Sequence, residues 1–246
     1  MKTFLNVLSA ERLKMARSRL WLVLLASPAL SALIGALVDL PDGAGSEAWP
    51  LLISAMSMLH ALLFLPIMAG LFPSFICRYE HTGGGWKQLL VLPVSRGAVY
   101  LAKFTVVVTL LAGSQLLFFA ALLIVGQIQG IAGPIPWDMI AVSLVGGLIA
   151  CLPLVALQLG VSLVWSSFAA PLAVNVSLTI PNLLIINSAK IGPFYPWAQP
   201  LLAMMPRGQE DYSAFNLPYE SLFVTVLGSF LLFLAAGMLY FRRKAI

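Results

Sequence analysis

Residues 51–76 have the sequence LLISAMSMLHALLFLPIMAGLFPSFI, and this stretch decides what kind of fold the chain can adopt. It contains no Asp, Glu, Lys or Arg, and His60 is its one titratable side chain. A helix of about 20 apolar residues crosses the hydrocarbon core of a bilayer, so this stretch is long enough to do so. It predicts a transmembrane helix with a single ionisable group near its middle.

Five further apolar runs of similar character lie on either side of this stretch. The 246 residues are 61% hydrophobic and only 9% charged, with a mean hydropathy of +0.98. A soluble domain carries roughly a quarter charged residues, so this composition excludes a soluble globular protein. We expect an all-α polytopic membrane protein, a single transmembrane domain over residues 1–246, with six spans at residues 20–38, 51–76, 100–128, 139–165, 168–187 and 222–241.

The basic residues lie on one side of the six predicted spans. Cytoplasmic flanks of membrane helices collect Lys and Arg, and this bias sets the orientation of the chain. Only Lys190 and Arg207 would lie outside, so both termini are expected in the cytoplasm. The inner side would hold Lys2, Arg12, Lys14, Arg17, Arg19, Arg78, Lys87, Arg96, Lys103, Arg242, Arg243 and Lys244.

Two segments outside the spans have their own character. Residues 1–19 mix apolar and basic side chains, which favours an amphipathic helix at the membrane interface over a merely solvated basic flank. Residues 188–221 contain five prolines and cannot form one straight helix. We expect this segment to fold back onto the outer rim as a broken hairpin.

Few polar side chains occur inside the spans, and His60, Asn175 and Asn182 are the candidates for a translocation path. Each also has a plainer interpretation: His60 as a neutral, hydrogen-bonded histidine, and the two asparagines as interhelical hydrogen-bonding groups. Because no carboxylate lies within a span, a carrier coupled to protons or sodium would be poorly equipped. The driving force is expected to come from elsewhere.

No cofactor, metal or nucleic-acid site is predicted in this chain. Cys77 and Cys151 lie in apolar stretches without the spacing of a metal site or a disulfide framework. The run Gly83-Gly84-Gly85-Trp86-Lys87 lacks the order of a phosphate-binding P-loop, which excludes a nucleotide site there. The basic residues flank membrane spans, where they set topology and do not indicate nucleic-acid binding.

A loop between the second and third spans carries a more specific pattern. It combines a Glu followed by Gly-Trp-Lys, a Leu-Pro-Val-Ser-Arg run, and a Tyr-Leu-Ala-Lys run, at Glu80, Gly85–Lys87, Leu92–Arg96 and Tyr100–Lys103. This pattern resembles the signature of ABC-2 type permeases, more narrowly the branch with lantibiotic-immunity and bacitracin-resistance permeases. The chain departs from it in two places, with Arg78 where a second acid often stands and Gly85 where Thr precedes the Trp.

The resemblance implies the permease subunit of an ATP-binding cassette exporter, which is not itself an enzyme. A separate ATPase subunit would bind ATP and Mg, and a second permease chain, identical or paralogous, would complete the path. The cargo would be an antimicrobial peptide, an antibiotic or a lipid-like molecule, exported across a bacterial cytoplasmic membrane. Residues 80–96 would form a coupling helix with ATPase-facing residues Glu80, Gly85, Trp86, Lys87, Leu89, Pro93 and Arg96, and the N-terminal helix would add Glu11 and Lys14.

Two other classes of function are open at this point. An ATP-independent channel or secondary carrier would work when nucleotide hydrolysis is blocked. A membrane-embedded protease could use Ser54 or Ser57 with His60, but no oxyanion motif accompanies these residues.

Overall fold

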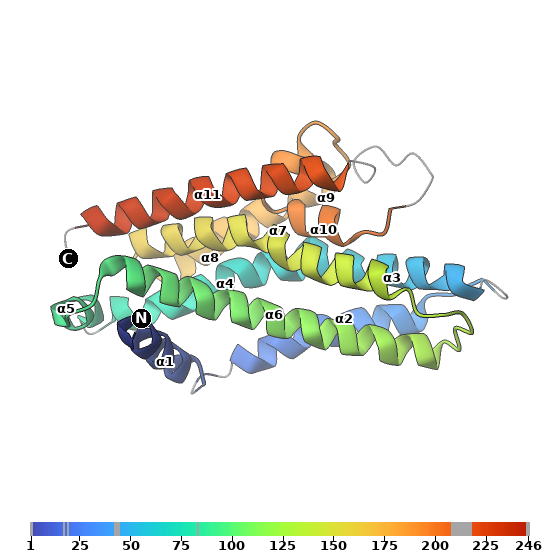
Figure 1. The fold of residues 1–246 in the computed structure, drawn as a ribbon, viewed down its shortest axis with the longest axis horizontal. Coiled ribbons are helices and arrows are strands. Elements are labelled where there is room, and N and C mark those ends of the chain that lie inside the picture. Colours follow the sequence, from blue (N-terminus) through green and yellow to red (C-terminus); the bar gives the residue numbers. More distant parts are fainter. Residues whose placement is uncertain are drawn as a thin grey trace.

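The computed structural model is an elongated bundle of helices that run along its long axis (Figure 1). It describes residues 2–16, 18, 20–41, 45–82, 84–207 and 218–244. The first helix, the α4–α5 turn and the end of the last helix all lie at one end of the bundle (Figure 1). The chain therefore brings its most basic segments together at a single end.

The helices follow the chain from α1 to α11, and no β-strand occurs among the described residues. Their bounds are α1 Lys2–Ala16, α2 Leu20–Leu37, η1 Gly45–Glu47, α3 Ala48–Leu59, η2 His60–Phe64, α4 Leu65–His81, α5 Gly85–Val91, α6 Arg96–Ile128, α7 Trp137–Val164, α8 Ala169–Thr179, α9 Asn182–Ile185, η3 Gly192–Phe194, α10 Gln199–Met204 and α11 Tyr219–Arg243.

Four helical runs are long and apolar enough to cross a membrane: Ala48–His81, Arg96–Ile128, Trp137–Val164 and Tyr219–Arg243. They contain the predicted second, third and sixth spans and all of the fourth except Trp165, and they extend beyond most of the predicted limits. The predicted first and fifth spans correspond to the shorter apolar helices Leu22–Leu37 and Ala169–Ile185. All six segments are helical, while the six-span topology and its orientation stay predictions.

The second span is one continuous helical run with a π-helical turn in its middle. In this turn the Leu65 N–H bonds to the carbonyl of His60, five residues back. Pro66 follows directly and has no N–H, so the carbonyl of Leu62 loses its ordinary helical donor. The Asn182 amide replaces that donor, since its Nδ2 lies 3.1 Å from the Leu62 oxygen.

The fifth predicted span is broken. α8 ends at Thr179 and α9 begins at Asn182, with a turn at Ile180 and Pro181 between them. Beyond it, the predicted hairpin folds back as η3 and α10, and α10 packs against α7 in the buried core. The part of the predicted hairpin at residues 208–217 lies outside the described residues.

Candidate functional site

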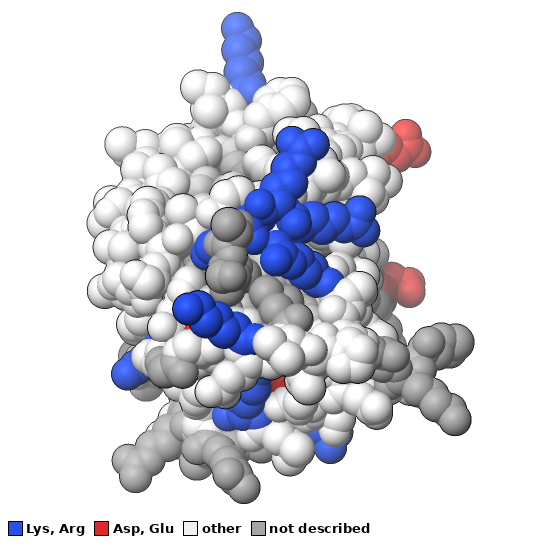
Figure 2. Space-filling model, turned by 90° about the vertical axis from the view of Figure 1, so that its left-hand side faces the viewer, with Lys and Arg blue, Asp and Glu red and all other residues white. Residues whose placement is uncertain are grey.

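At the end of the bundle that carries α5, Lys and Arg side chains gather on the surface and outnumber the acidic ones, which show at its margin and in small patches (Figure 2). This is the side on which charge counting places the cytoplasm. Some of these cations also cap helices. Arg96 Nη1 donates to the carbonyls of Phe241 and Arg242, both at 3.1 Å, and Lys244 donates to the carbonyl of Leu163. The cations thus satisfy carbonyls at the ends of α11 and α7.

The turn between α4 and α5 depends on two glycines. Gly84 has φ +73°, a conformation that glycine adopts without steric cost. At Gly85 a Cβ atom would lie 2.8 Å from Glu80 Cα and 2.9 Å from the Tyr79 oxygen. Only glycine lets α5 approach the end of α4 this closely. The coupling helix was predicted over residues 80–96, but the helix observed there, α5, is shorter and covers Gly85–Val91. Glu80 belongs to the last turn of α4, and Arg96 is the first residue of α6.

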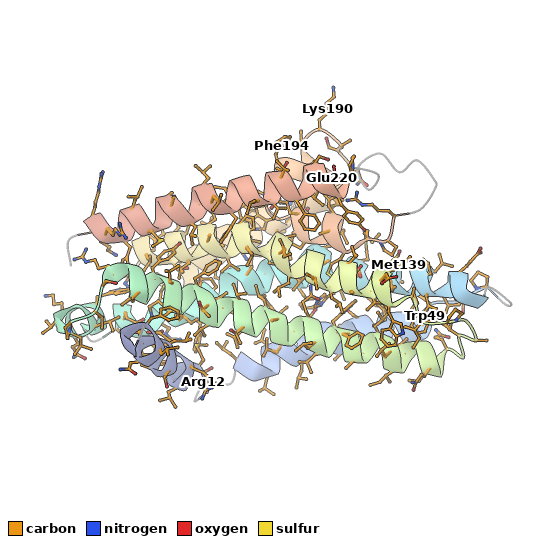
Figure 3. All side chains as sticks on the ribbon, viewed as in Figure 1. Arg12, Trp49, Met139, Lys190, Phe194 and Glu220 are labelled. Carbon is orange, nitrogen blue, oxygen red and sulfur yellow. The ribbon has the colours of Figure 1, made fainter. Side chains whose placement is uncertain are left out.

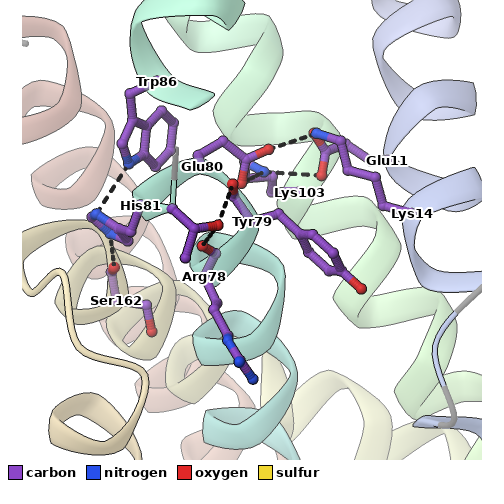
Figure 4. Close-up of polar contacts among 10 residues, drawn as sticks. Glu11, Lys14, Arg78, Tyr79, Glu80, His81, Trp86, Lys103 and Ser162 are labelled. Atoms are coloured by element: carbon purple, nitrogen blue, oxygen red, sulfur yellow. Dashed lines mark hydrogen bonds and ion pairs between the residues drawn. The ribbon is translucent and has the colours of Figure 1, made fainter. Parts of the chain in front are cut away.

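Behind this turn, four charged side chains form a closed ring (Figure 4). Lys14 Nζ lies 2.9 Å from Glu11 Oε1 and 2.6 Å from Glu80 Oε1. Lys103 Nζ lies 2.9 Å from Glu11 Oε2 and 2.9 Å from Glu80 Oε2. The Lys103–Glu80 contact is an ion pair without hydrogen-bond geometry, whereas the other three are hydrogen bonds. Each carboxylate oxygen thus faces one ammonium group.

The ring ties three helices together inside the protein. Glu11 comes from α1, Glu80 from the last turn of α4, and Lys103 from the second turn of α6. The side chains of Glu11, Glu80 and Lys103 are 1–3% exposed, and only Lys14, at 33%, reaches the surface. A buried charge without a partner is strongly destabilising, so separating these helices at the ring would be costly. Burial opposes the charge of Lys14, but Glu11 and Glu80 outweigh it and raise its pKa.

Trp86 anchors α5 from its buried side. Its indole Nε1 donates to His81 Nδ1 at 3.2 Å, and His81 Nε2 lies 3.0 Å from the carbonyl of Ser162 in α7 (Figure 4). With Nδ1 as an acceptor, His81 carries its proton on Nε2 and donates it to that carbonyl. The Trp86 ring also packs on Phe241 at 5.2 Å and lies 5.6 Å from the Lys103 ammonium.

The opposite side of α5 is open. Lys87 and Pro93 are exposed, Leu89 is half-buried, and Val91 and Leu92 are 85% and 54% exposed. Two adjoining clefts of about 370 and 350 Å³ lie beside this helix. The first separates α5 from α1, the second lies against the end of α4, and both include Lys14, Leu89 and Leu92 in their walls.

The residues predicted to contact an ATPase therefore fall into two groups. Glu11, Glu80 and Trp86 have partners within this chain and are buried, and Gly85 is part of the tight turn. Lys87, Leu89 and Pro93 remain available to a partner, Lys14 lies at the boundary between the groups, and Arg96 caps α11. Contact of any of them with an ATPase stays a prediction.

The candidate path residues are fully buried. His60 Nδ1 lies 2.6 Å from Ser27 Oγ, its Nε2 lies 3.2 Å from Gln115 Oε1, and its ring stacks on Phe118 at 4.3 Å. Asn175 Nδ2 donates to the carbonyl of Pro66 at 2.9 Å. These contacts join helices inside one chain, and a place on a translocation path stays a prediction for His60, Asn175 and Asn182.

Three residues of this site were missed as site residues from the sequence. Lys103 lies in the quoted motif, but nothing in its spacing shows that it pairs with Glu11, 92 positions away. His81 and Phe241 fix Trp86, yet a histidine before a glycine run and an aromatic near the C-terminus give no signal of this contact. One signal was present in the sequence: Lys103 is an isolated cation in an apolar helix, and Glu80 is an acid in the preceding loop. Their opposite charges could have predicted an ion pair.

Comparison with known proteins identifies the family. The family model described as ABC-2 family transporter protein matches residues 7–182, well over half of the chain, and covers the ring, α5 and the α8–α9 break. No curated protein gives a significant match. The narrower resemblance to lantibiotic-immunity and bacitracin-resistance permeases stays a prediction. The match over residues 7–182 shows that the chain belongs to the ABC-2 family of transporter proteins.

Proposed function

We propose that this chain is the permease subunit of an ATP-binding cassette exporter that moves a hydrophobic or amphipathic molecule out of the cell or the membrane. Its family makes it the membrane component of an ABC transporter, which implies an ATPase partner in a membrane context. Export, the class of cargo, a second permease chain and a bacterial cytoplasmic membrane are parts of the proposal.

The open side of α5 is the observation that supports this proposal most strongly. Val91 and Leu92 are exposed at an end of the bundle that is otherwise strongly basic. Apolar side chains that gather at such a place indicate a protein-binding surface. Lys87 lies on the same short helix, and the two clefts beside it can receive side chains of a partner. The ATPase subunit is the partner that the family implies.

The buried side of α5 explains how docking there would act on the spans. Trp86 contacts α11 through Phe241 and α7 through His81. The ionic ring joins the base of this turn to α1 and α6. A displacement of α5 by the ATPase would therefore move several spans together, because these contacts are packed and paired.

The test is to purify the tagged chain from its native membranes in a mild detergent and assay the preparation for vanadate-sensitive ATP hydrolysis. We expect a protein with an ATP-binding cassette at about equal stoichiometry, and loss of it in Leu92→Glu. Ile191→Glu is the matched control, since Ile191 is 58% exposed and lies between α9 and η3, outside α5 and its clefts. A chain that purifies alone and transports with hydrolysis blocked would instead be a channel or secondary carrier.

A further inference from the structure

A groove on the side of α1 away from α5 has a composition unlike that of the two clefts. Its volume is about 520 Å³, and it is bounded by α1, the start of α2 and the cytoplasm-proximal turns of α6. Small-molecule sites fall in the range of about 300–1,000 Å³, so the groove is large enough for a ligand. Its apolar wall is formed by Leu8, Met15, Leu20, Val106 and Leu110.

The two hydroxyl groups in the wall are already bonded within their own helix. Thr105 Oγ1 donates to the carbonyl of Leu101, and Thr109 Oγ1 donates to the carbonyl of Thr105, both at 2.8 Å. Hydroxyls bonded in this way leave mainly their methyl groups to line the groove. The interior is therefore suited to a hydrocarbon chain and offers little to a polar ligand.

Among the described residues that line the groove, Arg12 is the one with a charged side chain. It is exposed at the edge of the bundle, where α1 turns toward α2 (Figure 3). The acid next to it in the sequence, Glu11, is occupied by Lys14 and Lys103. Among the described residues, no carboxylate pairs with the Arg12 guanidinium. Its charge is available to an anion outside the chain.

The placement of α1 gives the groove a defined depth in a membrane. α1 lies across the bundle axis (Figure 1), with Val7 and Met15 buried and Leu5 and Leu13 56% and 60% exposed. Exposed leucines beside a cation are what a helix at the boundary of headgroups and acyl chains presents, and we infer that position for α1. The groove then has its cation at headgroup level and its apolar wall along α6, below that level.

We propose that this groove is a binding site for one anionic phospholipid, with an acyl chain along α6 and the phosphate on Arg12. The charge and the apolar wall favour this occupant over a zwitterionic phospholipid, whose ammonium group offsets its own phosphate and so weakens the attraction to Arg12. They also favour it over a second copy of the chain, which would bring its own basic α1 to a basic rim. The site is independent of the ATPase surface, because it lies on the other side of α1.

The experiment uses the full chain, delipidated in detergent, and native mass spectrometry with dioleoylphosphatidylglycerol or dioleoylphosphatidylcholine. We expect the first phosphatidylglycerol to bind more tightly than phosphatidylcholine. Arg12→Gln should weaken it about fivefold, the effect of one basic residue at an anionic membrane surface. Arg243→Gln is the matched control, since Arg243 is exposed at the same end but on α11.

A second pair of variants tests the groove without changing charge. Thr109→Phe fills the apolar wall and should weaken binding of both lipids, whereas Thr225→Phe on α11 should not. Thr225 is bonded to the carbonyl of Ser221 as Thr109 is to that of Thr105. Equal affinity for the two lipids, or equal binding by Arg12→Gln and Arg243→Gln, would overturn the proposal. A wild-type dimer that Thr109→Phe dissociates would assign the groove to a second copy instead.

Discussion

The basic end of the bundle and its middle bury polar groups in opposite ways. At the basic end, four full charges neutralise one another in a ring across α1, α4 and α6. In the middle, neutral amides serve the same purpose, because Asn175 and Asn182 bond to backbone carbonyls of α4 and its π-helical turn and to Trp197. The difference follows from what each place must do.

Near the interface, long charged side chains can pair with one another and stay partly hydrated. Such pairs can join separate helices. An ion pair in the hydrocarbon centre would lose its hydration, which costs free energy. Neutral amides that bond to carbonyls left without a donor by proline cost less there. The ring is consequently the more fragile arrangement, since removal of one partner leaves a buried charge.

Lys103→Met should have the largest effect on stability. It leaves Glu11 and Glu80, both buried, with Lys14 as their remaining cation, and such an uncompensated charge costs about 3–5 kcal/mol. We expect a large fall in the thermal unfolding midpoint of the detergent-solubilised chain. Lys87→Met, an exposed lysine at the same end, is the control. Glu80→Gln added to Lys103→Met should recover part of the loss; equal midpoints for Lys103→Met and Lys87→Met would disprove the ring's contribution.

Asn182→Ala should come second. It removes the donor to the carbonyls of Leu62 and Trp197, at 3.1 and 2.8 Å, and leaves both buried. An unsatisfied buried group costs about 1–3 kcal/mol. The same thermal measurement should therefore show a smaller fall than for Lys103→Met. Asn187→Ala, in the same segment, should lower the midpoint less, because the 3.3 Å bond from Asn187 to the Leu183 carbonyl is exposed; a loss as large as that of Asn182→Ala would point to the segment and not to these bonds.

Gly85→Ala should affect coupling more than stability. Its Cβ would lie 2.8 Å from Glu80 Cα, so α5 must shift away from α4. Gly84→Ala is the comparison, because it meets no atom within 4 Å and is strained only by its positive φ, at about 1–2 kcal/mol. We expect both variants to insert normally, with ATPase association reduced further in Gly85→Ala. Equal association in the two would show that the spacing of α4 and α5 is not what the partner recognises.

Sequence patterns predicted much of this architecture. Apolar runs located all six helical segments, because the length of a membrane span is imposed by the bilayer. The motif from Glu80 to Lys103 predicted the short helix between the second and third spans and the family. Glu11 and Lys14 were also identified as functional residues, although for contact with a partner and not for a buried ring.

The remainder depends on contacts that one sequence does not encode locally. Pro66 indicates a disturbed helix in the second span, but it does not predict a π-helical turn at His60–Phe64, where the Leu65 N–H bonds five residues back. The sequence also does not show that, on one seven-residue helix, Val91 is exposed and Trp86 is buried. Both are apolar, and which side of a short helix is buried is decided by α7 and α11, far away in the sequence.

Substitution of Lys14 should have the smallest effect on stability, and that effect should depend on pH. The pKa of Lys14 is raised above the ordinary value of 10.5, so its stabilising charge is complete below that pH and is lost only as pH rises through the raised value. Wild-type stability attributable to this contact should not change between pH 6 and 9. Lys14→His, with an ordinary pKa near 6.5, should bring the loss into this range, by less than about 1 kcal/mol because the site is partly solvated. The wild type, which keeps His60 and His81, supplies the baseline for thermal unfolding. A flat difference between the two profiles would mean that the fourth charge only screens the ring and does not fasten α1 to α4.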